Sequence, residues 1–312
     1  MHEFALLTND GSILVDGTIS TIGTNGGDIT LAAAENINFT ATGILDASAK
    51  AESGKGGTVS ISTAGKNGGQ IDMPAGVIDV SGDNAQGGKV HFRAPQVGGN
   101  DVAIGSIAGA INGARSIIAE AFRAYDNIAT IDQAVIDAVT ADADAFMTAA
   151  YANNVESRLG NATLVPGIDL RNNGDMELVT DWDLHNMRYG PDNVAGVLSL
   201  RAAGDLLINA NISDGFDSSE PNAQLIDGDS WTLNLVAGAN IDSPLVNALL
   251  NDNGSTMDSG SIIIGGASDP LEIIRLDPNN YDMSQIIGDP NTTEDYYAGW
   301  IKLRSAFFYH FG

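Results

Sequence analysis

The sequence predicts an all-β fold built as a solenoid, in which short strands stack on one another and one helical insertion interrupts the series. The first observation is a glycine pair followed by an alternating strand. This unit begins at Gly26, Gly56 and Gly87, so its spacing is 30 and then 31 residues. The second is the apolar and polar alternation within each strand, and the third is a change to helical periodicity between residues 131 and 150. Repeats of about this length are typical of solenoids and arrays.

The strands of one repeat hold too little apolar surface to form a core alone. Each repeat contains two or three strands of about five residues, and it therefore has to stack on its neighbours. We expect the strands of consecutive repeats to lie about 4.8 Å apart. The glycines are expected to form tight corners that a residue with a β-carbon would resist. The side chains expected to point inward are those of Ile29, Val59, Ile61, Val90, Leu178, Leu200 and Ile208.

The composition limits the classes of function. The chain of 312 residues has 40 acidic and 14 basic residues, a formal net charge of −26, and no cysteine. Nucleic acids and anionic membranes bind clusters of Lys and Arg, so we expect no nucleic-acid partner and no membrane insertion. Aspartate at turns accounts for the acidity, and calcium between stacked aspartates is the alternative. No other cofactor or metal is expected, because the histidines lie far apart, at His2, His91, His185 and His310.

Along the chain, the repeats divide into two runs. Residues 5–101 form the first run of solenoid coils, and residues 164–268 continue the same body. Residues 102–163 are predicted to be a helical insertion. Residues 269–312 are predicted to be an irregular cap or tail, because prolines and aromatic residues replace the strand pattern there. This tail is expected to cover the last coil, whereas the first coil is expected to present an open strand edge.

One stretch of the insertion has clear helical periodicity. Apolar residues fall three or four positions apart from Ile131 to Ala150, and Thr130 with Gln133 resembles a capping box. The stretch 116–125 fits either a helix or a strand, and a strand is favoured. The helix is expected to lie outside the strands and to pack on them through Ile131, Val135, Val139 and Phe146.

Several strands resemble segments of filamentous haemagglutinin-type exoproteins. The likeness covers about residues 11–266, and its clearest segments are LSLRAAGDL at 198–206, SDGF at 213–216 and SWTLNLVAGA at 230–239. The resemblance implies a right-handed parallel β-helix within a very long bacterial surface protein, exported through an outer-membrane two-partner transporter and used in adhesion. The N-terminal secretion domain of that family is not recognisable, and no signal peptide is visible. We therefore expect an internal part of a longer secreted protein.

No catalytic motif is present, and no catalytic residue is predicted. The alternative enzyme class is a β-helix polysaccharide lyase or hydrolase. That architecture offers a long groove for sugars, and its chemistry needs carboxylates that converge on one bond. The candidates for such a site are Asp169, Asp175, Asp181 and Asp183 with Arg171 or Arg201. Aspartates at turns account for the same residues without catalysis.

The expected function is that of a structural or adhesive segment on the bacterial surface, presented for attachment to host cells or glycans. A passive filament shaft is the further alternative, because a shaft lacks the exposed aromatic patch that binding faces carry. The candidate binding residues are Trp182, Tyr189, Phe216 and Trp231, whose alternative role is packing inside the fold. End-to-end self-association through the open strand edge is a further expected interaction.

Overall fold

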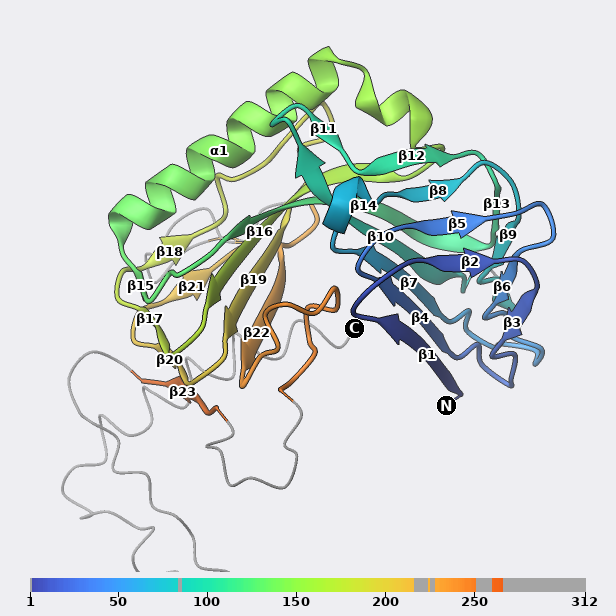
Figure 1. Ribbon diagram of the computed structural model, residues 1–312, viewed down its shortest axis with the longest axis horizontal. Helices are drawn as coiled ribbons and strands as arrows, with labels where there is room; N and C mark the ends of the chain where they lie inside the picture. Colours follow the sequence, from blue (N-terminus) through green and yellow to red (C-terminus); the bar gives the residue numbers. More distant parts are fainter. Residues whose placement is uncertain (1, 84–85, 216–223, 225–227, 251–259, 266–312) are drawn as a thin grey trace, which may run out of the picture. The chain divides into compact units, whose positions relative to one another are not determined.

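The computed structural model describes residues 2–83, 86–215, 224, 228–250 and 260–265 (Figure 1). The chain divides into two units, Met1–Ile264 and Gly265–Gly312, and the description below concerns the first unit. Strands dominate this unit, and its described residues contain one α-helix. The expected cap at residues 269–312 lies outside the described residues.

The main element of the unit is a nine-stranded sheet. Its order is β1-β4-β7-β10-β14-β16-β19-β22, and β11 (Asp101–Val102) joins it at β10 as an antiparallel neighbour. Every pair along the main path is parallel. The sheet is strongly curled, and its strands follow an arch in Figure 1. The other strands are Glu3–Thr8 (β1), Asp28–Ala33 (β4), Thr58–Thr63 (β7), Gly88–Val97 (β10), Ala114–Tyr125 (β14), Thr163–Asn172 (β16), Val197–Ala202 (β19) and Thr232–Ala237 (β22).

Four smaller parallel sheets accompany the main one. Their orders are β12-β8-β5-β2, β13-β9-β6-β3, β15-β17-β20-β23 and β18-β21. The first two belong to the N-terminal repeats, and the last two belong to the C-terminal repeats. Their strands are Ile13–Val15 (β2), Thr18–Ser20 (β3), Ile37–Phe39 (β5), Ile44–Asp46 (β6), Ile71–Met73 (β8), Val77–Asp79 (β9), Ile104–Ile107 (β12), Ala110–Asn112 (β13), Thr130–Ile131 (β15), Met176–Leu178 (β17), Trp182–Asp183 (β18), Leu206–Ile208 (β20), Ile212–Ser213 (β21) and Ile262–Ile264 (β23).

The chain visits these sheets in a regular order, which confirms the predicted repeat. Each N-terminal repeat gives one strand to the nine-stranded sheet, the next to the sheet of β2 and the third to the sheet of β3. Ile29 lies opposite Val59, and Val59 lies opposite Val90, so paired residues are 30 and then 31 positions apart. The expectation of an all-β fold of parallel strands is therefore confirmed.

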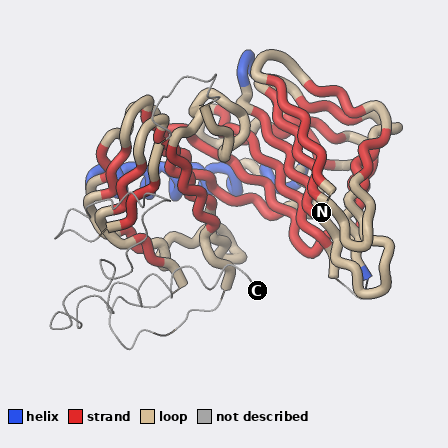
Figure 2. The backbone as a smooth tube through the Cα atoms, turned by 90° about the horizontal axis from the view of Figure 1, so that it is seen from below, coloured by secondary structure: helices blue, strands red, loops and turns tan. Residues whose placement is uncertain are grey.

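A single apolar cluster fills the space between the sheets. It contains residues of both runs of repeats. Figure 2 shows the stacked strands that contribute these residues. Alternation along each strand decides which side chain enters the cluster. All the residues expected to point inward are buried: Ile29, Val59, Ile61, Val90, Leu178, Leu200 and Ile208.

The repeated glycines have a different physical basis from the one expected. A β-carbon on Gly26 would lie 1.9 Å from the carbonyl oxygen of Ala47, and one on Gly56 would lie 1.9 Å from that of Val80. Neither glycine has a left-handed backbone conformation. Close approach of stacked backbones, rather than the conformation of a corner, therefore requires glycine at these two positions.

Aspartate and asparagine side chains link the turns of neighbouring repeats. Asp175 Oδ1 accepts a hydrogen bond from the backbone N–H of Asp205, 30 residues later, at 2.8 Å. Asp205 in turn accepts from the N–H of Ser261. Because such a link supplies a partner for a turn N–H, it explains part of the high acidity. The other links join Asn25 to Lys55, Asn36 to Gln70, Asp83 to Ser53 and Asp181 to Asn211. The described part of the chain contains no group of three or more His, Asp or Glu side chains placed to hold a metal ion.

The helix α1 (Gln133–Ala152) is shorter than the expected insertion. Residues of 102–131 form β12, β13, β14 and β15, which pair in parallel with β8, β9, β16 and β17 of neighbouring repeats. The preference for a strand at 116–125 is confirmed by β14. Two short 3-10 turns, η1 (Lys66–Gly68) and η3 (Val155–Arg158), complete the helical elements of the described residues.

The start of α1 and its buried face both differ in part from expectation. Asp132 caps the helix by accepting a hydrogen bond from the N–H of Val135 at 3.0 Å, so the expected box of Thr130 and Gln133 is wrong. Ile131 is buried as part of β15, and Val135 is half-buried and packs against the apolar cluster, as expected. The face that packs on the apolar cluster consists of Ile136, Val139, Ala143, Phe146, Met147 and Ala150. Among the described residues, no helix is long and apolar enough to cross a membrane.

The apolar cluster gives a direct test of the strand register. Val59 is completely buried, so Val59→Asp places an unpaired charge among aliphatic side chains. We expect the free energy of unfolding to fall by more than about 3 kcal/mol, as measured by urea titration. Leu14→Asp is the control, because Leu14 is also an apolar residue of a strand but is 64% exposed. Equal stability of the two variants would contradict the register.

Candidate functional site

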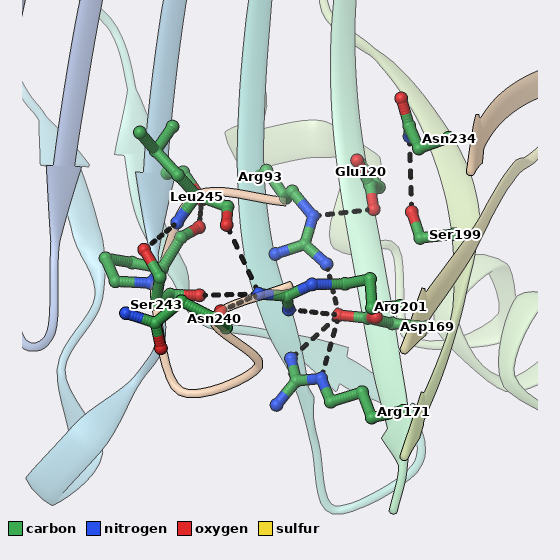
Figure 3. A network of polar contacts seen from close by, with 12 residues as sticks. Arg93, Glu120, Asp169, Arg171, Ser199, Arg201, Asn234, Asn240, Ser243 and Leu245 are labelled. Atoms are coloured by element: carbon green, nitrogen blue, oxygen red, sulfur yellow. Dashed lines mark hydrogen bonds and ion pairs between the residues drawn. The ribbon is translucent and has the colours of Figure 1, made fainter. Parts of the chain in front are cut away.

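The outward face of the nine-stranded sheet carries a cluster of charged residues on four neighbouring strands. Arg93 in β10 lies directly opposite Glu120 in β14. Asp169 and Arg171 occupy alternate positions of β16, and Arg171 lies opposite Arg201 in β19. Because residues two apart in a strand share a face, the sheet brings these five side chains to one surface (Figure 3). We call them the arginine cluster.

Three arginines of this cluster converge on one carboxylate oxygen. Asp169 Oδ2 lies 2.7 Å from Arg93 Nη2, 2.7 Å from Arg171 Nη2 and 3.4 Å from Arg201 Nη1. Arg93 Nε also donates to Glu120 Oε1 at 3.0 Å. The adjacent strand arginines, Arg171 and Arg201, would repel each other without an acidic partner. Asp169 provides that partner for both (Figure 3).

The cluster is buried, although it carries several charges. The side chains of Glu120, Asp169 and Arg201 are at most 1% exposed, Arg93 is 4% exposed, and Arg171 is 17% exposed. Buried charges are tolerated only when they are paired and hydrogen-bonded. The cluster contains three guanidinium groups and two carboxylates, so its own count leaves one positive charge. This local excess of positive charge is opposite in sign to the net charge of the chain, which is −26.

Burial and mutual attraction shift the pKa values in this cluster. Burial raises the pKa of Asp169, but the charges of Arg93, Arg171 and Arg201 lower it by more, so the carboxyl titrates below its ordinary value. Burial lowers the pKa of Arg201 to about 10, against the attraction of Asp169. Both groups are therefore ionised at neutral pH.

A segment that follows β22 crosses the outward face of the sheet and covers the cluster. We call residues 239–250 the crossing segment. Arg201 Nη2 donates to the carbonyl oxygens of Asn240, Ser243 and Leu245, at 2.7, 3.2 and 3.3 Å. Ser62 Oγ in β7 donates to the carbonyl oxygen of Pro244 at 2.7 Å. The crossing segment is thus tied both to β19 and to the distant strand β7. It lies on the concave side of the curled sheet, which is the outward face, turned away from the apolar cluster (Figure 1).

A cavity of about 400 Å³ lies between the crossing segment and the sheet. Arg93, Arg171 and Phe122 line its sheet side, and Asp242 and Pro244 line its opposite side. The guanidinium carbon of Arg93 lies 3.7 Å from the centre of the Phe122 ring, and that of Arg171 lies 5.8 Å from it. Both guanidinium groups therefore lie within cation–π distance of the same ring. The arrangement is chemically suited to holding an anionic group.

The acidic residues considered for catalysis do not lie together in one site. Asp169 belongs to the arginine cluster together with Arg171 and Arg201, as the sequence allowed. Asp175 and Asp181 accept backbone N–H groups of the next repeat, and Asp183 pairs with His185 at 2.8 Å. The turn role anticipated for these aspartates therefore accounts for Asp175 and Asp181. Asp169 instead forms the centre of a buried cluster.

The aromatic candidates for binding are buried, and they do not form an exposed patch. Trp182, Tyr189 and Trp231 are 1%, 3% and 2% exposed. Tyr189 and Trp231 pack edge to face with ring centres 6.2 Å apart, and Trp231 Nε1 donates to the carbonyl oxygen of Met187. Their large apolar surface is the physical reason for packing inside. Phe216 lies outside the described residues.

Sequence reasoning missed Arg93 and Glu120 as partners in one site. Each stands between apolar residues of a strand, Arg93 between Phe92 and Ala94 and Glu120 between Ala119 and Ala121. A charged residue that alternates with buried ones normally points to solvent. Charged residues recur at outward positions of successive strands, and this pattern could have indicated that they meet. The sequence does not show that another segment covers that face.

The arginine cluster predicts a large cost for removing its central carboxylate. Asp169→Ala leaves three buried arginines without their common partner, so we expect a loss of about 3 to 5 kcal/mol in the free energy of unfolding. Asp142→Ala is the matched control. Asp142 also pairs with an arginine, Arg123, at 3.0 Å, but its side chain is 36% exposed. The control should lose less than about 1 kcal/mol. Similar losses of stability in both variants would contradict the role of Asp169 as the common partner of three buried arginines.

The lowered pKa of Asp169 predicts a specific dependence of stability on pH. The folded pKa lies below the unfolded value of about 3.9, so the stabilisation is complete above that value and is lost as pH falls through the folded pKa. The stability difference between the wild type and Asp169→Asn should therefore be constant from pH 7 to 5 and should shrink below about pH 4. Urea midpoints measured across this range test it, and a constant difference down to pH 2 would refute it.

Comparisons were made with protein-family models, with curated proteins and with solved structures. No family model matches the chain, and neither does any curated protein or solved structure. The likeness to filamentous haemagglutinin-type exoproteins therefore remains a resemblance of sequence segments.

Proposed function

We propose that this chain is a right-handed parallel β-helix and serves as a structural and adhesive segment of a secreted bacterial surface protein. In this proposal the chain attaches to host cells or glycans and performs no catalysis. The observation that carries the proposal is the series of eight parallel strands from β1 to β22 in the main sheet, which passes through every repeat of the described unit. A stack that grows by one strand per repeat makes a long, stiff body from a short motif. Such a body suits the display of a binding surface away from a cell.

The hydrogen bonds between neighbouring repeats support a structural role for this chain. The main sheet joins neighbouring repeats through backbone hydrogen bonds, and the acidic and amide side chains at the turns add links such as Asp175 to Asp205. None of these links needs a disulfide, and the chain has no cysteine. A chain without crosslinks can pass unfolded through an outer-membrane transporter and then gain its stability by stacking. Export by a two-partner transporter is therefore part of the proposal.

The strand at the N-terminal edge supports self-association as a further part of the proposal. β1 pairs with β4 on one side, and it is the edge strand of the described sheet. Phe4 and Leu6 lie opposite the buried Ile29 and Leu31 but are themselves 36% and 41% exposed. Exposed strand edges of this kind pair with other strands. End-to-end pairing with a second copy is the expected use of this edge.

The attachment function predicts binding without turnover. The purified chain should bind saturably to host cells or to members of a panel of immobilised acidic and neutral polysaccharides, and it should release no reducing ends or unsaturated products during prolonged incubation. Surface plasmon resonance measures the binding, and a reducing-sugar assay with absorbance at 235 nm measures cleavage. Product release would favour the polysaccharide lyase or hydrolase alternative. Absence of binding to glycans and to host cells would favour a passive shaft and overturn the adhesive part of the proposal.

A further inference from the structure

The cavity between the crossing segment and the sheet has positively charged side chains on its sheet side and, among the described residues, no carboxylate on that side. Arg93 and Arg171 line the cavity, whereas their carboxylate partners Glu120 and Asp169 are not among its lining residues. The two acids therefore lie behind the arginines and neutralise them from the far side. With Arg201, the cluster has one guanidinium more than it has carboxylates. An anion in the cavity would face three lining guanidinium groups, those of Arg93, Arg123 and Arg171, and one lining carboxylate, that of Asp242.

The two lining arginines retain hydrogen-bond donors. Arg93 uses Nε and Nη2 for Glu120 and Asp169, and Arg171 uses Nε and Nη2 for Asp169. Among the described residues, no hydrogen bond is made by Nη1 of either arginine. Arg201 differs, because its Nη1 contacts Asp169 and its Nη2 is shared by three carbonyl oxygens. Arg93 and Arg171 are thus the donors that face the cavity.

The walls of the cavity determine which anion fits. Pro95, Phe122 and Pro244 give it apolar surface, and its volume of about 400 Å³ lies at the lower end of small-molecule sites. Such a mixed wall suits a sugar ring that carries one acidic group better than it suits a bare inorganic ion. Asp242 lines the cavity and is exposed, and its negative charge lowers the affinity for any anion, most of all for one with two negative charges. Arg123, which also lines the cavity, is paired with Asp142.

We infer that this cavity binds the acidic group of a saccharide, with a sugar carboxylate held by Arg93 and Arg171 and the ring packed against Phe122 and Pro244. Planar guanidinium groups match the geometry of a carboxylate, and they form stronger hydrogen bonds to it than neutral donors do. The binding site is built on rigid strands, and Asp169 orients both arginines before the ligand arrives. This inference deepens the proposed attachment function and rests on it for the identity of the polymer.

The test uses sodium glucuronate as the probe and isothermal titration calorimetry as the measurement. Glucose is the neutral control, and sulfate is the inorganic control. We expect glucuronate to bind more tightly than either, and its affinity should fall as salt concentration rises. Arg171→Gln should weaken glucuronate binding about tenfold or more, because it removes a charged donor. Arg115→Gln is the matched control, since Arg115 is exposed in β14 and does not line the cavity.

A second variant keeps the test decisive if Arg171→Gln does not fold. Asp242 is exposed, so Asp242→Asn should leave the melting temperature unchanged. Removing its negative charge should raise the affinity for glucuronate severalfold. Equal binding of glucose and glucuronate, tighter binding of sulfate than of glucuronate, or unchanged glucuronate affinity in folded Arg171→Gln and Asp242→Asn would each overturn the inference.

Binding of the polymer separates this inference from the proposed function. Glucuronate binding that depends on Arg171, together with no attachment to any acidic polysaccharide or cell, would support the cavity and overturn the adhesive function. Polysaccharide attachment that is unchanged in Arg171→Gln would support the adhesive function and overturn the cavity as its ligand site. Loss of both in Arg171→Gln, with Arg115→Gln unaffected, is the result that we expect.

Discussion

Parallel pairing between a strand and its counterpart one repeat later is the interaction on which the rest of this structure depends. It holds the nine-stranded sheet together from β1 to β22. Because pairing is in register, each inward aliphatic residue lies on the one before it, as Ile29 does with Val59 and Val90. The same constraint explains Gly26 and Gly56, where stacked backbones approach too closely for a β-carbon. Parallel pairing in register therefore explains both the alignment of the core residues and the need for glycine at positions 26 and 56.

The register that aligns the core also aligns charges on the opposite face. Alternation puts Arg93, Glu120, Asp169 and Arg201 outward on four neighbouring strands. On a flat sheet such residues would be solvated and would contribute little. Here the curl of the sheet and the crossing segment bury them, so their pairing has to be nearly complete. The cluster is best understood as a structural device that leaves two arginines directed at a cavity.

The crossing segment covers the arginine cluster and is also held in place by it. Three of its carbonyl oxygens accept hydrogen bonds from the single nitrogen Nη2 of Arg201, and Pro244 accepts one from Ser62, which lies 182 residues earlier in the chain. These bonds satisfy backbone groups that would otherwise be buried without partners. A ligand at Arg93 and Arg171 would therefore lie beside a segment that is positioned by the same charges. Asp169 contacts both the arginines that line the cavity and Arg201, which holds the crossing segment.

Periodicity in the sequence was enough to predict the repeat, the stacking of equivalent strands, the inward residues and a helix after residue 130, because periodicity depends on local geometry alone. The sequence also placed aspartates at turns, where Asp175 and Asp181 are found. The tertiary structure decided the rest. Burial of Trp182 and Trp231, strand formation at 104–112 and 130–131 and the meeting of Arg93 with Asp169 all depend on contacts between repeats. Curvature of the sheet and the path of residues 239–250 are sums of many weak preferences, and no local pattern encodes them.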